Sequence, residues 1–98
     1  MNLNRVLRQE KKEFILSKQV MRSGTSIGAN VAESQQAQSR ADFIAKLNIA
    51  LKEASETNYW LRLLHATDYL SDAEFRSIQH DCEELERMLA AIIKTTRK

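Results

Sequence analysis

The 98-residue sequence contains no proline, only two glycines and a single cysteine. Tight turns between strands depend on proline and glycine, so their scarcity argues against a β-rich fold. The lone Cys82 excludes an internal disulfide, which fits a reducing compartment. No apolar run approaches the roughly 20 residues of a membrane span, and the N-terminus lacks a signal-peptide core. These absences predict an all-α cytoplasmic protein that forms one domain over residues 1–98.

The longest helical pattern runs from Ser39 to His65. Ser39, with Asp42 three residues later, matches a capping box at the start of a helix. At about 100° per residue, one arc roughly 160° wide collects apolar side chains and predicts the core face. Its members are Phe43, Ile44, Leu47, Ala50, Leu51, Ala54, Leu61 and Leu64.

The opposite side of this stretch is apolar as well. It carries Ile49, Glu53, Glu56, Trp60 and Leu63, spaced four, three, four and three residues apart. Scattered surface apolar residues are common. Three in one seam, including the only Trp, favour an interface, because Trp is enriched at buried anchor positions. We therefore predict that these five residues form an oligomer interface.

The remaining segments predict three more helices. Residues 2–10 form a short first helix, Glu10–Glu13 a polar connection, and residues 14–34 a second helix. Residues 35–38 lead into the long third helix, which ends near Asp68. Ser71 and Glu74 form a capping box for the fourth helix. Its predicted core seam is Phe75, Ile78, Cys82, Leu85, Leu89 and Ile92.

Two glycines, Gly24 and Gly28, lie four residues apart inside the second helix. The run SGTSIGAN could form a loop, but the apolar stripe Leu16, Val20, Ile27 and Val31 keeps its register through it. Each glycine costs roughly 1 kcal/mol of helix propensity. We therefore expect another helix to approach closely at both. A phosphate-binding loop is excluded by the spacing and by the absence of a Lys after Gly28.

Charge is distributed unevenly, although the net charge is only +2. Residues 1–52 carry a net charge of +5 and residues 53–98 a net charge of −3. Such asymmetry indicates either an anionic partner or head-to-tail pairing of subunits. One basic group, near the N-terminus, comprises Arg5, Arg8, Lys11, Lys12, Lys18 and Arg22. A second group, on the fourth helix beside His80 and Glu83, comprises Arg76, Arg87, Lys94 and Lys98. Both are candidate RNA- or DNA-binding residues, although a charged helix face is usually just solvated.

No arrangement typical of catalysis, metal binding or cofactor binding is found. His65 and His80 lie on different predicted helices, and His80, Asp81 and Cys82 point about 100° apart, so they cannot converge on one ion. Glu53 and Glu56 lack the Glu-x-x-His partners of a di-metal carboxylate site. We therefore expect no enzyme activity, no cofactor and no small-molecule substrate.

The run Gln19–Glu33, the segment Ser39–Phe43 and the segment Ala50–Leu61 together resemble the bacterial family of proteins encoded in 23S rRNA intervening sequences. The resemblance covers roughly residues 10–95. It implies an up-and-down antiparallel four-helix bundle that assembles as a homopentamer around a central channel. It also implies a relation to the accessory protein of diversity-generating retroelements, a basic pentamer that binds nucleic acid and the reverse transcriptase. Members usually carry several helical turns before the segment matching Glu10–Glu13, so we expect a short or truncated first helix here.

Two functions follow from these observations. The first is a non-enzymatic homo-oligomer, expected to be a pentamer, that binds RNA or DNA non-specifically or associates with rRNA or the ribosome. The second is an oligomeric scaffold that binds only protein partners. Phosphate binding weakens steeply with salt, which separates the two experimentally.

Overall fold

The computed structural model describes the backbone of residues 3–97 and the side chains of residues 11–97. Within the described part, the chain forms three helices: α1 (Leu3–Ser34), α2 (Arg40–Ala66) and α3 (Asp72–Thr96). The all-α prediction is confirmed. A four-helix bundle is not confirmed, because the predicted first and second helices are one continuous helix.

Helix α1 runs unbroken through the segment Glu10–Glu13, which we predicted to be a connection. That prediction was wrong because Glu and Lys are good helix formers, and polarity alone does not end a helix. The segment containing Gly24 and Gly28 is helical, as expected. The helix ends at Ser34, whose hydroxyl donates a 2.6 Å hydrogen bond to the Val31 carbonyl.

Helix α2 begins and ends close to the predicted positions. The Ser39 side chain accepts a 3.0 Å hydrogen bond from the Asp42 amide, and the Asp42 carboxylate accepts one from the Gln38 amide rather than from Ser39. The chain turns at Asp68, which adopts a positive φ of 65°. Asp tolerates this left-handed conformation better than most residues.

Helix α3 starts at a complete capping box. The Ser71 hydroxyl accepts from the Glu74 amide, and the Glu74 carboxylate accepts from the Ser71 amide, each at 3.1 Å. The predicted core seam of α3 is confirmed at four of its six positions, with Leu85 partly buried against the core cluster. Phe75, Cys82, Leu89 and the unpredicted Ile93 are buried, whereas Ile78 and Ile92 are exposed.

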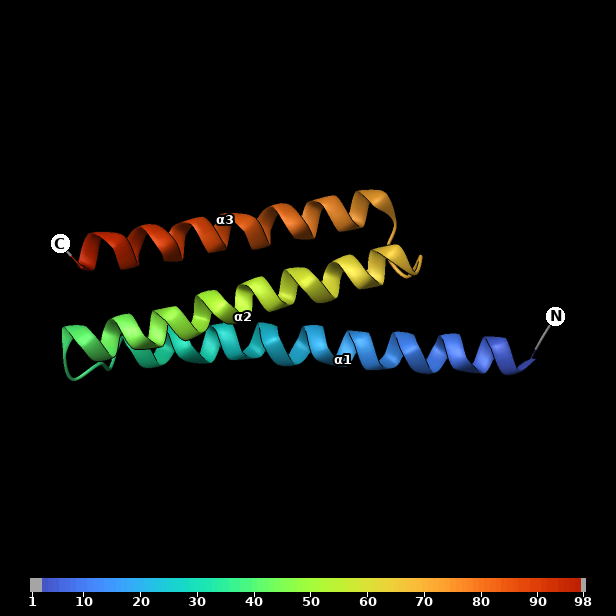
Figure 1. The fold of residues 1–98 in the computed structure, drawn as a ribbon, viewed down its shortest axis with the longest axis horizontal. Helices are drawn as coiled ribbons and strands as arrows, with labels where there is room; N and C mark the ends of the chain where they lie inside the picture. Colours follow the sequence, from blue (N-terminus) through green and yellow to red (C-terminus); the bar gives the residue numbers. More distant parts are fainter. Residues whose placement is uncertain (1–2, 98) are drawn as a thin grey trace.

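The three helices form a single layer, with α2 between α1 and α3 (Figure 1). The Cα positions span 59 × 23 × 13 Å, so the molecule is long and thin. The backbones of α1 and α3 each pack along α2 and do not approach each other. The main core cluster lies where all three contribute side chains, and it comprises Ile27, Leu47, Ala50, Ala54, Leu89 and Ile93. The first part of α1 extends beyond the ends of α2 and α3 (Figure 1).

The predicted core arc of α2 is confirmed. Leu47, Ala50, Ala54, Leu61 and Leu64 are buried. Phe43, Ile44 and Leu51 are partly buried against the same cluster. Among the described residues, no helix is long and apolar enough to cross a membrane.

Candidate interaction surfaces

Glu53 and Glu56, predicted to lie in an oligomer interface, bind α1 of the same chain. Arg22 forms an ion pair with the Glu56 carboxylate, and its other terminal nitrogen lies 3.7 Å from Glu53 Oε2. That Glu53 oxygen is buried and accepts no hydrogen bond. Arg22 was predicted to bind nucleic acid, but its guanidinium is held against these two carboxylates. Its main role in the single chain is therefore to join α1 to α2.

The apolar members of the same seam are partly open. Trp60 and Leu63 are half-buried, and Ile49 is exposed. The Trp60 indole donates a 3.2 Å hydrogen bond to Glu56 Oε1, and its ring meets the exposed Tyr59 edge-on at 5.0 Å. Trp60 is thus held in one orientation with part of its surface accessible. That arrangement suits an interface, which stays a prediction for Ile49, Trp60 and Leu63.

The basic residues of α3 are placed on its outer side. Arg76, Arg87 and Lys94 are all exposed, while Lys98 lies outside the described residues. Glu84 lies 3.5 Å from Arg87 and 3.9 Å from His80, so one carboxylate partly offsets the charge of this stripe. Asp72 likewise interacts electrostatically with Arg76, so carboxylates lie beside two cations of the stripe.

The basic residues of α1 differ in their surroundings. Lys11, Lys12 and Lys18 are exposed, whereas the side chains of Arg5 and Arg8 lie outside the described residues. Because Arg22 is paired internally, the N-terminal basic group is not one continuous set. The three lysines stay candidates for contact with an anionic surface.

Gly24 and Gly28 are exposed and do not pack closely on another helix of the chain. A Cβ built on either one would meet nothing within 4 Å. Within the single chain, our expectation of close helix packing at these glycines is therefore wrong. The close contact between α1 and α2 is made instead by the neighbouring face of α1, through Ser23, Ile27 and Ser34.

Small polar residues that sequence reasoning missed hold this contact. Ser23 is fully buried, and its hydroxyl lies 2.7 Å from the hydroxyl of Thr57. Ser23 donates its proton to the Gln19 carbonyl at 3.0 Å and can accept from Thr57, whose single hydroxyl proton has the Ser23 oxygen and the Glu53 carbonyl, at 2.8 Å, as alternative acceptors. These bonds satisfy polar groups that would otherwise be costly to bury. Ser23 is next to Gly24 in the sequence. The helix contact was therefore predicted on the glycine face of α1, whereas it lies on the adjacent face that carries Ser23.

The glycines line a groove between α1 and α3, with α2 as its floor. We call this hollow of about 400 Å³ the α1–α3 groove. Its lining is mainly apolar and includes Gly24, Gly28, Leu61, Ile78, Asp81 and Cys82. Cys82 donates a hydrogen bond to the Ala54 carbonyl at 3.2 Å, and burial raises the pKa of its thiol to about 11. A thiol in that state is a poor nucleophile, which agrees with a packing role.

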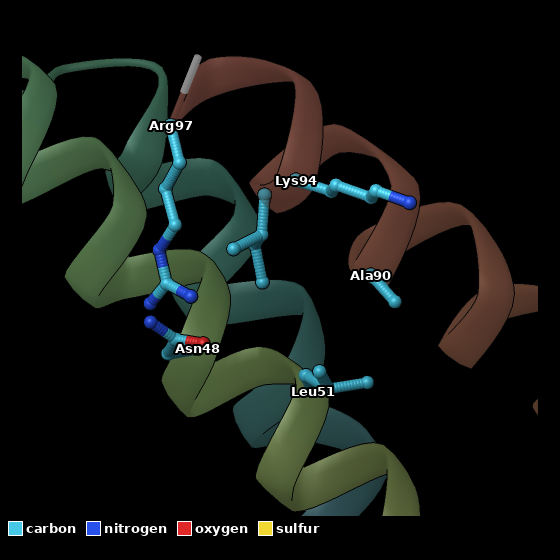
Figure 2. Close-up of a pocket in the computed structure, with 6 residues that line it drawn as sticks. Asn48, Leu51, Ala90, Lys94 and Arg97 are labelled. Atoms are coloured by element: carbon cyan, nitrogen blue, oxygen red, sulfur yellow. The ribbon is translucent and has the colours of Figure 1, made fainter.

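A second hollow lies between the first half of α2 and the last turns of α3. It has a volume of about 310 Å³ and is lined by Asn48, Leu51, Ala90, Ile93, Lys94 and Arg97. Figure 2 shows the guanidinium of Arg97 directed toward the Asn48 side chain, while the Lys94 amine points away from it. Arg97 is therefore directed toward α2 and does not extend the outer basic stripe of α3.

The histidines show no arrangement for catalysis. His65 Nε2 lies 2.6 Å from Asp72 Oδ1, and its ring stacks on Phe75 at 4.3 Å. This contact joins the end of α2 to the start of α3, and the hydrogen bond from His65 lowers the pKa of Asp72. Over the described residues, no group of three His, Cys, Asp or Glu side chains could hold a metal ion.

Comparison with known proteins gives one family and a solved relative. The family model described as 23S rRNA-intervening sequence protein matches residues 1–91. A crystal structure from Bacteroides thetaiotaomicron, described as a protein of unknown function from the S23 ribosomal protein family, is 61% identical and superposes with a TM-score of 0.82. The match covers 87% of this chain and 76% of that chain. No functionally curated protein matches the chain.

Proposed function

The chain belongs to the family of 23S rRNA-intervening sequence proteins, and on that premise we propose that it is a non-enzymatic homo-oligomer that binds RNA or DNA without sequence preference. The observation that carries the proposal is the basic stripe of α3, formed by Arg76, Arg87 and Lys94, which are all exposed. The name of the family refers to an rRNA segment, which favours RNA as the first ligand to test.

The stripe needs to be repeated to bind well. A protomer with a net charge of +2 attracts phosphate weakly, and Glu84 offsets part of the charge of Arg87. In a cyclic oligomer, expected to be a pentamer, each stripe recurs around a ring and the positive field adds up. No aromatic side chain accompanies the stripe, so base stacking contributes little and sequence preference is weak. We expect an affinity in about the micromolar range or weaker, falling steeply with salt.

A gel-shift titration with RNA and DNA at two salt concentrations tests nucleic-acid binding. The triple variant Arg76→Glu, Arg87→Glu and Lys94→Glu is expected to abolish the shift, while its circular dichroism stays that of a folded helical protein. A matched control, Arg40→Glu, Lys52→Glu and Arg62→Glu, changes the net charge equally at exposed positions of α2 and is expected to keep most of the binding.

If the wild type gives no gel shift with RNA or DNA at low salt, the proposal that it binds nucleic acid is wrong. The proposal is also wrong if the control triple variant loses as much affinity for nucleic acid as the α3 triple variant. A scaffold that binds only protein partners would then be the better function for this chain.

Self-association is tested by light scattering on the wild type and on Trp60→Ala. Trp60 is half-buried and held by its hydrogen bond to Glu56, so its exposed part can act as a preformed anchor. Loss of an anchor of this type costs about 2 kcal/mol or more of association free energy. A monomeric wild type would contradict the proposed oligomer. If Trp60→Ala leaves the mass of the oligomer and its self-association affinity unchanged, Trp60 is not part of the interface.

A further inference from the structure

The hollow of about 310 Å³ between the first half of α2 and the last turns of α3 has the features of a small-molecule site. We propose that this α2–α3 hollow binds a small aliphatic monocarboxylate, with the carboxylate at Arg97 and the aliphatic chain between the two helices. Such binding goes beyond the proposed function, because it involves neither nucleic acid nor a second copy of the chain.

The size of the hollow suits a small ligand. Small-molecule sites in proteins usually occupy about 300–1,000 Å³, so this hollow lies at the lower end of that range. Its lining on α3 runs from Ala90 to Arg97, which is about 10 Å along the helix at a rise of about 1.5 Å per residue. An extended chain of about eight carbon atoms has a similar length, since C–C bonds are about 1.5 Å long.

The two ends of the hollow differ in chemistry. At one end, the Arg97 guanidinium is directed toward the Asn48 side chain (Figure 2). Leu51 and Ala90 lie at the other end (Figure 2). Ile93, which is 5% exposed, adds a further aliphatic side chain to the lining. A guanidinium and an amide donate hydrogen bonds, so the lining matches a molecule with an acceptor head and an aliphatic body.

The charge of the lining favours an anion. Two cations, Lys94 and Arg97, line the hollow, and no carboxylate does. Among the described residues, neither cation forms an ion pair. Arg97 is the cation that reaches the polar end, whereas the Lys94 amine points away from Asn48 (Figure 2). An anionic head at Arg97 would therefore form a charge-assisted hydrogen bond that the described part of the chain leaves unmade.

A carboxylate fits this end better than a phosphate monoester. Arg97 is the C-cap of α3, where free carbonyl groups give the helix end a negative partial charge. These carbonyls repel the nearly double charge of a phosphate monoester more strongly than the single charge of a carboxylate. The planar guanidinium can pair with both oxygens of one carboxylate. No aromatic side chain lines the hollow, so an aliphatic body is favoured over an aromatic ring that would stack.

Octanoate is the probe that tests this site. Octanol and octylamine are its matched controls, because they carry the same chain with no charge or with a positive charge. Each ligand is titrated into the isotope-labelled intact protein, and amide resonances are followed by NMR. Octanoate is expected to shift the resonances of Asn48, Ala90 and Arg97 and to saturate at millimolar concentration, as is usual for so small a ligand. Octanol and octylamine are expected to bind about fivefold more weakly or less, because neither can pair with the guanidinium as an anion does.

Two substitutions locate the bound probe. Arg97→Gln removes the charge at the polar end, and Ala90→Leu fills the apolar end. Each is expected to weaken octanoate binding about fivefold or more. Helix content is expected to stay the same by circular dichroism, because both positions are exposed. Arg62→Gln and Ala91→Leu, at exposed positions outside the lining, are expected to leave the affinity for octanoate unchanged.

Three results would overturn the proposal. The first is the absence of shifts at Asn48 and Arg97 with millimolar octanoate. The second is octanol or octylamine binding as tightly as octanoate, since the carboxylate would then contribute nothing. The third is an affinity for octanoate that Arg97→Gln and Ala90→Leu both leave unchanged, because the probe would then bind elsewhere on the protein.

Discussion

Replacing Arg22 by Ala should destabilise the chain mainly through Glu53. Arg22 is the cation facing both carboxylates, and its side chain is 49% exposed while that of Glu53 is only 15% exposed. After the substitution, Glu56 keeps the hydrogen bond from the Trp60 indole, whereas the buried Oε2 of Glu53 has neither charge partner nor donor.

The expected cost follows from these exposures. Removing a charged partner from a buried group costs about 1.5–3 kcal/mol. The guanidinium of Arg22 is half-exposed, so solvent screens its interaction with the two carboxylates. The cost of Arg22→Ala should therefore lie near the lower end of this range. We expect a loss of about 1.5–2 kcal/mol, or a melting temperature lower by about 10 °C in a chain of this length.

Urea denaturation, followed by circular dichroism at a dilution where the midpoint is independent of protein concentration, measures the effect. Glu53→Gln removes the stranded charge, so the double variant with Arg22→Ala should recover about 1 kcal/mol relative to the sum of the single changes. Arg62→Ala, at an exposed position of α2, serves as the control and should change stability by less than about 0.5 kcal/mol. Strictly additive effects of Arg22 and Glu53, or a loss for Arg22→Ala no larger than the control's, would refute the reasoning.

Three further predictions follow from the same structure. Gly28→Ala should stabilise the dilute protein by about 1 kcal/mol, because the added methyl meets no neighbour and only helix propensity changes; a lower urea midpoint would contradict this. The pKa of Asp72 is lowered by its hydrogen bond with His65, and that of Glu74 by hydrogen bonds from the N-cap serine, so both carboxylates stabilise the fold above their ordinary values of 3.8 and 4.5. That stabilisation should be lost as the pH falls through the lowered values, and Asp72→Asn and Glu74→Gln should flatten the fall in urea midpoint between about pH 5 and pH 3. Cys82, with a pKa near 11 against an ordinary 9.0, should react with a thiol reagent at pH 8 about 100-fold more slowly than the unfolded chain, and equal rates would show that the thiol is not held in the core.

The family could be identified from the sequence because its motifs lie in α1 and α2, and the match covers residues 1–91. Helix α2 and the start of α3 were also determined locally. An amphipathic arc places Leu47, Ala50 and Ala54 in the core, and the serine caps fix where each helix begins. These features depend on residues within one or two turns of each other, which is the range over which side-chain spacing carries information.

Only the tertiary structure decided which neighbours each face meets. The polar segment Glu10–Glu13 continues α1 because nothing in the chain requires a turn there. Glu53 and Glu56 face Arg22 instead of a second subunit, and the contact side of α1 is that of Ser23, one residue from the glycines. A periodic pattern shows that a face is apolar or charged but not what covers it, because that depends on helices far away in the sequence. For the same reason, the seam of α3 could be found from spacing, while its division between α2 and an open groove could not.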